Sequence, residues 1–228
     1  MATALVIVET QNDQIKKASR ELIQHLVSQG CDVEAVAFAK ETGNLDGNFK
    51  EELAQAGVSK ATVYTNDQLD RYQYPLYRDS LVEHVKSDSY CLVAAAATAL
   101  GKDLLPGLSV AVGGSFAGDC TSLECKGNEV LAERPFLAGK YFSKVKFRTG
   151  PAVISTRPNS LGMKEVEKKD ASLEFKAAMG STEKQNCTQV EGSADAGNID
   201  LSEAEVIISG GRSLKSAENF KIFSDLAE

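Results

Sequence analysis

Hydrophobic residues in the first half of the chain follow two alternating patterns. Short patterns typical of strands occur at Ala4–Glu9, Val33–Ala39, Ala61–Tyr64 and Tyr90–Ala97. The second of them alternates Val33, Ala35 and Ala37 with Glu34 and Val36. Between the predicted strands lie stretches with helical spacing, at Ile15–Gln29, Phe49–Ala56 and Pro75–Lys86. Parallel strands need a helical crossover, so this alternation predicts a layered α/β domain with a mostly parallel sheet. The fourth apolar run has no polar position and is expected near the centre of that sheet.

The pattern changes after Leu108. Glycine-containing turns separate short extended runs that predict β-hairpin material added to the parallel sheet, at Val130–Phe136, Tyr141–Arg148 and Ala152–Thr156. We expect Arg134-Pro135 to start an edge strand and Ala138-Gly139 to form a turn. The next stretch, Pro158–Ser202, is polar and loosely patterned, and it becomes linker-like towards its end.

A second domain is predicted near the end of the sequence. A fresh strand is expected at Glu205–Ile208, followed by a turn at Gly210-Gly211 and a helix that runs from Ala217 and is capped by Ser216. Residues 1–198 therefore form the first predicted domain, and residues 203–228 are the beginning of another.

Composition and charge exclude several classes of protein. The chain has 228 residues, of which 43% are hydrophobic and 25% charged, as in ordinary globular proteins. The apolar run Cys91–Ala97 is much shorter than the roughly 20 residues that cross a bilayer, so no membrane insertion is expected. A formal charge of −7 without a basic stripe argues against binding to nucleic acid.

Cysteine and histidine are too few and too scattered to form a metal site. Five cysteines form no C-x-x-C motif, a pattern typical of unpaired thiols in a reducing compartment. Two histidines, His25 and His84, lie within predicted amphipathic helices and are expected on half-buried helix faces. The N-terminus lacks a secretory or Arg-rich targeting pattern, so we expect a bacterial cytoplasmic location, or the mitochondrial matrix if a transit peptide has been removed.

The turn at Ser209–Arg212 is the strongest candidate for binding chemistry. Glycine lets the backbone turn sharply and approach a ligand. The N-terminus of a following helix favours an anion, and Arg212 adds a planar cation that binds phosphate or stacks on a ring system. By itself this turn lacks the full G-x-G-x-x-G fingerprint of a dinucleotide site.

Three longer motifs resemble one known family. Ser209–Phe220 (SGGRSLKSAENF) resembles the segment that opens the FAD domain in the α-subunit of electron transfer flavoproteins. Thr98–Pro106 (TALGKDLLP) is similar to that family's turn after the fourth strand, and Arg134–Lys140 (RPFLAGK) to its hairpin motif. Because all three occur in the family's order and spacing, the resemblance covers essentially the whole chain.

The resemblance implies an electron carrier rather than an enzyme with catalytic side chains of its own. Such carriers are heterodimers in which the α-subunit holds FAD and the β-subunit binds AMP. They accept electrons from acyl-CoA and related dehydrogenases, as in fatty acid β-oxidation, and pass them to a quinone oxidoreductase or another acceptor. The resemblance implies that Arg212 contacts FAD near the flavin, while Gly210 and Gly211 permit the backbone turn. The cofactor then supplies the redox chemistry.

Several features depart from the family pattern. Ser213 and Ala217 stand where the family usually has glycine, and Gly107 where it usually has arginine. The sequence stops at Glu228, whereas family members continue through the rest of the FAD domain. We therefore expect a fragment, a split gene product or a shortened form that holds FAD weakly or not at all by itself.

Two other functions remain open at this stage. An adenine-nucleotide-binding regulatory module of the universal-stress type has a related α/β domain. It would carry a glycine-rich phosphate loop after the fourth strand, where this chain has alanines and Gly101 alone. A fragment that serves assembly only would bind nothing but its partner. After the fourth strand we expect Thr98 to cap a helix, with a phosphate site less expected there. Loop anchoring, rather than base stacking, is expected of three tyrosines: Tyr72, Tyr74 and Tyr77.

Overall fold

The computed structural model describes residues 2–45, 47–183, 204 and 206–227, which belong to two compact units, 1–190 and 191–228. We describe each unit by itself. The described residues of the first unit form twelve strands: β1 (Thr3–Ile7), β2 (Thr10–Gln11), β3 (Gln14–Ile15), β4 (Asp32–Ala39), β5 (Lys60–Thr65), β6 (Leu92–Ala96), β7 (Ser115–Cys120), β8 (Ser122–Lys126), β9 (Glu129–Phe136), β10 (Tyr141–Lys146), β11 (Ala152–Thr156) and β12 (Ser172–Ala177). Its helices are α1 (Lys17–Ser28), the short 3-10 helix η1 (Thr42–Asn44), α2 (Gly47–Gln55), α3 (Tyr74–Ser87) and α4 (Ala99–Ala111).

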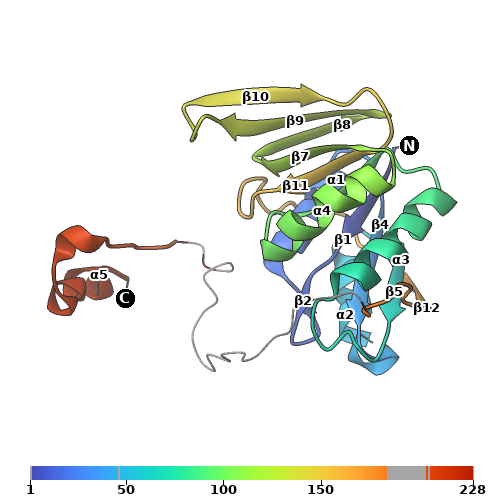
Figure 1. The fold of residues 1–228 in the computed structure, drawn as a ribbon, viewed down its shortest axis with the longest axis horizontal. Coiled ribbons are helices and arrows are strands. Elements are labelled where there is room, and N and C mark those ends of the chain that lie inside the picture. The colour runs from blue at the N-terminus through green and yellow to red at the C-terminus, as the bar shows by residue number, and fades with distance from the viewer. Residues whose placement is uncertain (1, 46, 184–203, 205, 228) are drawn as a thin grey trace. The chain divides into compact units, whose positions relative to one another are not determined.

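A seven-stranded sheet forms the centre of the first unit, in the order β12-β5-β4-β1-β6-β11-β7 (Figure 1). Every neighbouring pair in it is parallel. The α/β fold with a mostly parallel sheet and an added hairpin region is therefore confirmed. The apolar fourth strand, β6, is interior to the sheet as predicted, and all its residues are buried.

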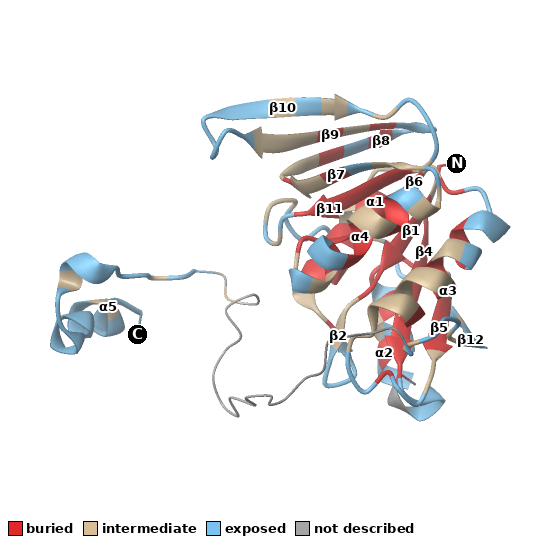
Figure 2. Cartoon of the chain, viewed as in Figure 1, coloured by how far each residue is buried: buried red, intermediate tan, exposed pale blue. Residues whose placement is uncertain are grey.

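Helices cover both faces of this sheet. Alternate residues of β1 point to opposite faces: Ala4 and Val6 join the core under α1 and α2, while Leu5 and Ile7 join the core under α3 and α4. Burial therefore concentrates on the strands and on the inner helix faces (Figure 2). The C-terminal end of α1 matches the prediction, since Gly30 has φ +81°. The helix begins later than predicted, because Ile15 belongs to β3.

A smaller antiparallel sheet, β10-β9-β8, lies beside β7 (Figure 1). The predicted hairpin of β9 and β10 is confirmed, and Leu137, Ala138 and Gly139 make its turn with positive φ angles. Arg134-Pro135, however, does not start an edge strand: it lies near the end of β9, the middle strand. Beyond Glu133, β9 pairs only with β10, so Pro135 still lies where the missing N–H is tolerated.

Two strands correct the sequence-based prediction. The residues predicted as hairpin material at 152–156 form β11, a fully buried parallel strand between β6 and β7. In the region predicted to be loosely patterned, Ser172–Ala177 forms the edge strand β12, paired with β5. Its polar residues alternate with apolar ones (SLEFKA), and most of its residues are exposed, as at the edge of a sheet. Both strands are defined by pairing with residues far away in the sequence, and the local hydrophobic pattern does not predict such pairing.

The chain between β11 and β12 is held by a buried carboxylate. Glu21 in α1 is 3% exposed and accepts hydrogen bonds from three backbone N–H groups, those of Asn159 (2.8 Å), Leu161 (2.8 Å) and Gly162 (2.6 Å). These contacts fasten the connecting segment to α1 on its way from the interior of the sheet to the far edge. A charge this buried is tolerated because it is fully hydrogen-bonded.

The described part of the second unit contains two 3-10 helices, η2 (Arg212–Leu214) and η3 (Ala217–Phe220), and helix α5 (Lys221–Ala227). The prediction of a strand at 205–208 is wrong for residues 206–208, the part that the structure describes, because they form no strand. None of the described residues in this unit is buried, so this piece lacks the apolar packing that would fix a strand there. The domain junction predicted between residues 198 and 203 lies outside the described residues.

Candidate functional site

The order of the parallel strands reverses at β1, which pairs with β4 on one side and with β6 on the other. Open α/β sheets bind ligands in the crevice outside the carboxyl ends of the strands at such a point. Here the residues just beyond β1 and β6 include Glu9 and Thr98, and helix α4 begins beside them. A nucleotide or phosphate site in the first unit is therefore expected at this crevice.

A carboxylate of the protein already occupies this crevice. The Thr98 hydroxyl donates a hydrogen bond to Glu9 Oε1 and accepts one from the Gly101 N–H at 3.2 Å. Lys16 Nζ lies 3.9 Å from Glu9 Oε2, and the Glu9 side chain is only 10% exposed. The positive end of α4 thus faces an internal anion, which would repel a bound phosphate. The predicted Thr98 cap is confirmed, and the arrangement counts against the nucleotide-binding alternative.

A second cation at this edge is also engaged. Arg157, just beyond β11, donates to both carboxylate oxygens of Asp119, from Nε at 3.1 Å and from the terminal nitrogen at 2.5 Å. The guanidinium holds the pKa of Asp119 below its ordinary value, while partial burial opposes that shift. This bidentate pair leaves Arg157 poorly placed to bind an external anion.

Close packing of α4 against β6 explains the glycine in the Thr98–Pro106 motif. A Cβ on Gly101 would lie 2.0 Å from the carbonyl oxygen of Ala96. Gly101→Ala is therefore expected to lower the free energy of unfolding by about 2 kcal/mol or more, although alanine favours helix. Chemical denaturation measures this. Gly47→Ala, at an open position in α2, is the matched control and is expected to be neutral or stabilising. An equally stable Gly101→Ala variant would contradict the packing argument.

The tyrosines near Pro75 anchor their loop, as predicted. The Tyr72 hydroxyl donates to Asp103 Oδ2 at 2.7 Å, and Tyr77 stacks on Phe38 with ring centroids 3.8 Å apart. Burial and the Asp103 carboxylate raise the pKa of Tyr72. A Cβ on Gly107 would lie 2.0 Å from the Tyr74 hydroxyl oxygen, so Tyr74 fills the space beside this departure from the family pattern.

The predicted FAD-contacting residues lie together in the second unit. Arg212 begins η2, is exposed, and has no ion-pair partner among the described residues. A Cβ on Gly211 would meet nothing within 4 Å, whereas one on Gly210 would lie 2.4 Å from Leu214 Cδ1. Ser216 precedes η3 as expected, but its side chain makes no cap hydrogen bond. An accessible backbone and a cation suit contact with a large anionic cofactor, although no described residue here is buried enough to enclose one.

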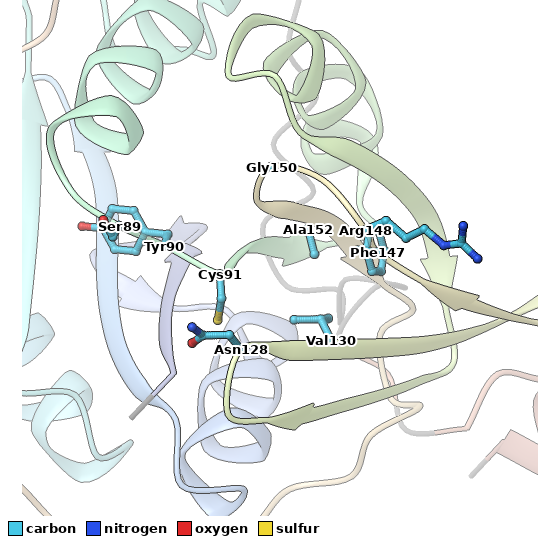
Figure 3. Close-up of a pocket in the computed structure, with 9 residues that line it drawn as sticks. All are labelled: Ser89, Tyr90, Cys91, Asn128, Val130, Phe147, Arg148, Gly150 and Ala152. Atoms are coloured by element: carbon cyan, nitrogen blue, oxygen red, sulfur yellow. The ribbon is translucent and has the colours of Figure 1, made fainter.

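A cavity of about 280 Å³ lies at the opposite, amino-terminal edge of the sheet (Figure 3). Its lining includes Cys91, Asn128, Val130, Arg148 and Gly150. Arg148 lines the cavity, and in Figure 3 its guanidinium extends away from Cys91 and Asn128. Sequence analysis identified no site here. Among the described residues, no group of His, Cys, Asp and Glu is placed to hold a metal ion.

The end of the β9–β10 hairpin exposes apolar side chains on both of its faces, and we call them together the hairpin surface. Its members are Phe136 (55% exposed), Leu137 (58%), Tyr141 (63%) and Phe142 (63%). Tyr141 pairs directly with Phe136 across the two strands. Clustered exposed aromatic residues are typical of protein–protein contact sites. The hairpin motif was predicted from the sequence, but the exposure of these apolar side chains was not.

Comparisons with known proteins point to a single family. The family described as "Electron transfer flavoprotein domain" matches residues 4–185. The electron transfer flavoprotein subunit alpha of Bacillus subtilis (strain 168) is 28% identical over 182 residues, 79% of this chain and 56% of that protein. The corresponding protein of Mycobacterium leprae (strain TN) is 28% identical over 100% of this chain and 70% of its own length. The mitochondrial subunit alpha of Oryza sativa subsp. japonica is 36% identical over 99% of this chain and 65% of its own length.

The chain thus spans 56 to 70% of the length of these curated relatives. Among the described residues, no helix combines the length and apolarity needed to cross a bilayer. The family match covers most of the sequence, and the layered fold agrees with it. The chain belongs to the electron transfer flavoprotein family and is of its α-subunit type.

Proposed function

We propose that this chain is the α-subunit part of a heterodimeric, FAD-dependent electron carrier. It pairs with an electron transfer flavoprotein β-subunit that binds AMP. The complex accepts electrons from acyl-CoA and related dehydrogenases and passes them to a quinone oxidoreductase or another acceptor. It acts in the bacterial cytoplasm, or in the mitochondrial matrix of a eukaryote.

One observation from the structure supports this proposal above the others: the first unit closes its own ligand-binding crevice. Glu9 and Thr98 occupy the position where a related nucleotide-binding domain would place a phosphate. The same unit exposes the hairpin surface. A domain with a filled crevice and an exposed apolar surface suits the role of a platform for a partner. Family membership supports the electron-transfer role itself.

Arg212, with Gly210 and Gly211, is the proposed FAD contact of this chain. FAD supplies the redox chemistry when bound, and the chain contributes a cation and an accessible backbone turn. The guanidinium is exposed and has no ion-pair partner among the described residues, so it is available to an anionic or aromatic ligand.

Co-expression of the complete protein with its β-subunit tests the proposal. The purified complex is expected to show a flavin absorption spectrum that is bleached by an acyl-CoA dehydrogenase together with its substrate. A colourless complex with the β-subunit would contradict the carrier proposal and leave assembly as the function. Colourless protein that binds ATP tightly would instead support the nucleotide-binding alternative.

Removal of the Arg212 cation is expected to weaken flavin binding. Loss of a charged hydrogen bond or stacking contact costs about 1.5–3 kcal/mol, which corresponds to about ten- to a hundredfold in FAD affinity. Flavin content and FAD titration of the Arg212→Ala complex measure this effect. Lys221→Ala removes another exposed cation of the same unit and is expected to leave affinity unchanged. Equal flavin affinity in the Arg212→Ala and native complexes would remove Arg212 from the proposed site.

A further inference from the structure

Three cysteines gather at the amino-terminal edge of the parallel sheet. Cys31 directly precedes β4, Cys91 directly precedes β6, and Cys125 lies in β8. The start of β1 lies between the first two, because β1 pairs with both β4 and β6. The Cys91 N–H donates to the Thr3 carbonyl at 3.0 Å. Residues far apart in sequence thus meet at one edge, where the flavin proposal uses none of them.

Cys31 and Cys125 lie in one hydrophobic core cluster and interact through their thiols. Both residues are buried, with exposed fractions of 4% and 5%. The hydrogen bond from Cys125 lowers the pKa of Cys31, against the opposing effect of burial, and the same contact raises the pKa of Cys125. The pair is therefore asymmetric: Cys31 is the one more readily converted to the nucleophilic thiolate.

The cavity in Figure 3 approaches the pair on the side of Cys125, and neither thiol of the pair lines it. Cys91 and Val130 both line it, and the Cys91 sulfur points towards Asn128 at the β8–β9 turn. Val130 is the direct cross-strand partner of Cys125. Side chains of directly opposed residues lie on the same face, with Cβ atoms about 5 Å apart. A small solute in the cavity is therefore separated from Cys125 by one side chain.

Hydrogen bonds of the Gln29 side chain hold the segment around Cys125 beside the end of α1. The Cys125 N–H donates to Gln29 Oε1 at 2.7 Å, and Gln29 Nε2 donates to the Leu123 carbonyl at 2.8 Å. Gln29 is the C-cap residue of α1, two positions before Cys31. The end of α1 is thus fixed to β8, which places Cys31 and Cys125 on neighbouring segments.

We propose that Cys31 and Cys125 form a redox-active dithiol that is oxidised to an intramolecular disulfide by a small peroxide entering through the cavity beside Cys91. The thiolate of one member of the pair attacks one peroxide oxygen, giving a sulfenic acid and releasing water from hydrogen peroxide. The sulfur of the other member then attacks the sulfenic sulfur, the S–S bond forms, and a second water leaves. Two thiols give up two electrons to one peroxide, and a dithiol reductant reverses the reaction.

The experiment treats the full, reduced chain with hydrogen peroxide under native conditions, then denatures it in an alkylating agent and maps peptides by mass spectrometry. We expect a Cys31–Cys125 linked peptide, and a fall in free thiols from the five of the sequence to three. Dithiothreitol is expected to restore all five thiols. A protein with all five thiols intact, a different disulfide, or isolated oxidised cysteines without this link would overturn the proposal.

Matched variants separate the pair from the other thiols. Cys31→Ser and Cys125→Ser are each expected to abolish the linked peptide, whereas Cys187→Ser is expected to form it at the native rate. Mapping of the unsubstituted chain decides the question even if a buried variant fails to fold. Failure of the flavin proposal would leave this inference untouched, because neither the peroxide reaction nor its readout involves flavin.

Discussion

Replacing Glu34 by glutamine is expected to lower the free energy of unfolding at neutral pH by about 3 kcal/mol. Burial alone would raise the pKa of this carboxyl, but hydrogen bonds from His84, Tyr90 and Lys60 outweigh burial and lower it to about 2 from 4.5. That difference corresponds to about 3 kcal/mol of preference for the ionised form in the folded state. Glutamine resembles the protonated carboxyl and loses that preference.

The contacts around Glu34 explain why its charge is tolerated in the interior. Tyr90 donates to Oε2 at 2.7 Å, and His84 Nε2 lies 3.1 Å from Oε1. The other ring nitrogen of His84 lies 3.1 Å from the Tyr64 hydroxyl. The tautomer with its proton on Nε2 satisfies both ring nitrogens, with Tyr64 donating to Nδ1. The cluster joins β4, β5 and α3, so its loss affects the sheet and one helix layer together.

The same cluster predicts a pH dependence. Because folding lowers the pKa of Glu34, its stabilising contribution is fully present above about pH 4.5 and is lost as the pH falls towards 2. Urea denaturation at a series of pH values measures the slope, which is expected to be shallower in Glu34→Gln. Glu51→Gln, at an exposed carboxyl paired with Lys168, is the control and is expected to match the native slope. Parallel profiles for Glu34→Gln and native protein would contradict the prediction.

The sequence predicted those parts of the fold that local patterns determine. The four strands and three helices up to Ala97 carry complete apolar patterns and short connections, and each of them is present. The strands β11 and β12 were misassigned because their identity depends on where they pair. The local sequence of a short strand does not show whether it belongs to a hairpin, to a parallel sheet or to a loop until its pairing partner is known. The return of the chain past α1, fixed by Glu21, is a long-range contact of this kind.

The candidate sites likewise divide into features that local sequence patterns predict and contacts that only the fold brings together. Thr98 was predicted as a cap because its neighbours form a local helix-start signal. The carboxylate that meets it, Glu9, is far away in sequence and becomes relevant only once β1 and β6 are known to be neighbours. A signal was nevertheless present, since Glu9 is the charged residue that ends the first predicted strand. The contact of Cys31 with Cys125 had no comparable signal, because no spacing rule connects them.

On the proposed function, replacing aromatic residues of the hairpin surface by serine is expected to weaken binding of the β-subunit at least tenfold. Phe136, Tyr141 and Phe142 are each more than half exposed, and aromatic residues of this kind carry much of the binding energy in protein interfaces. Removing one such anchor costs about 2 kcal/mol or more. The variants are Phe142→Ser and the paired change Phe136→Ser with Tyr141→Ser, measured by calorimetric titration with the β-subunit.

Stability separates an interface role from a folding role in this experiment. Because the substituted side chains are largely in solvent, thermal unfolding of the isolated chain is expected to stay unchanged. Val110→Ser in α4 is the matched control: it removes an apolar side chain that is 81% exposed but lies outside the hairpin surface. Native affinity in both hairpin variants, or an equal loss in the Val110 control, would place the partner elsewhere. Weakened binding confined to the hairpin variants would mean that this exposed apolar surface holds the partner subunit.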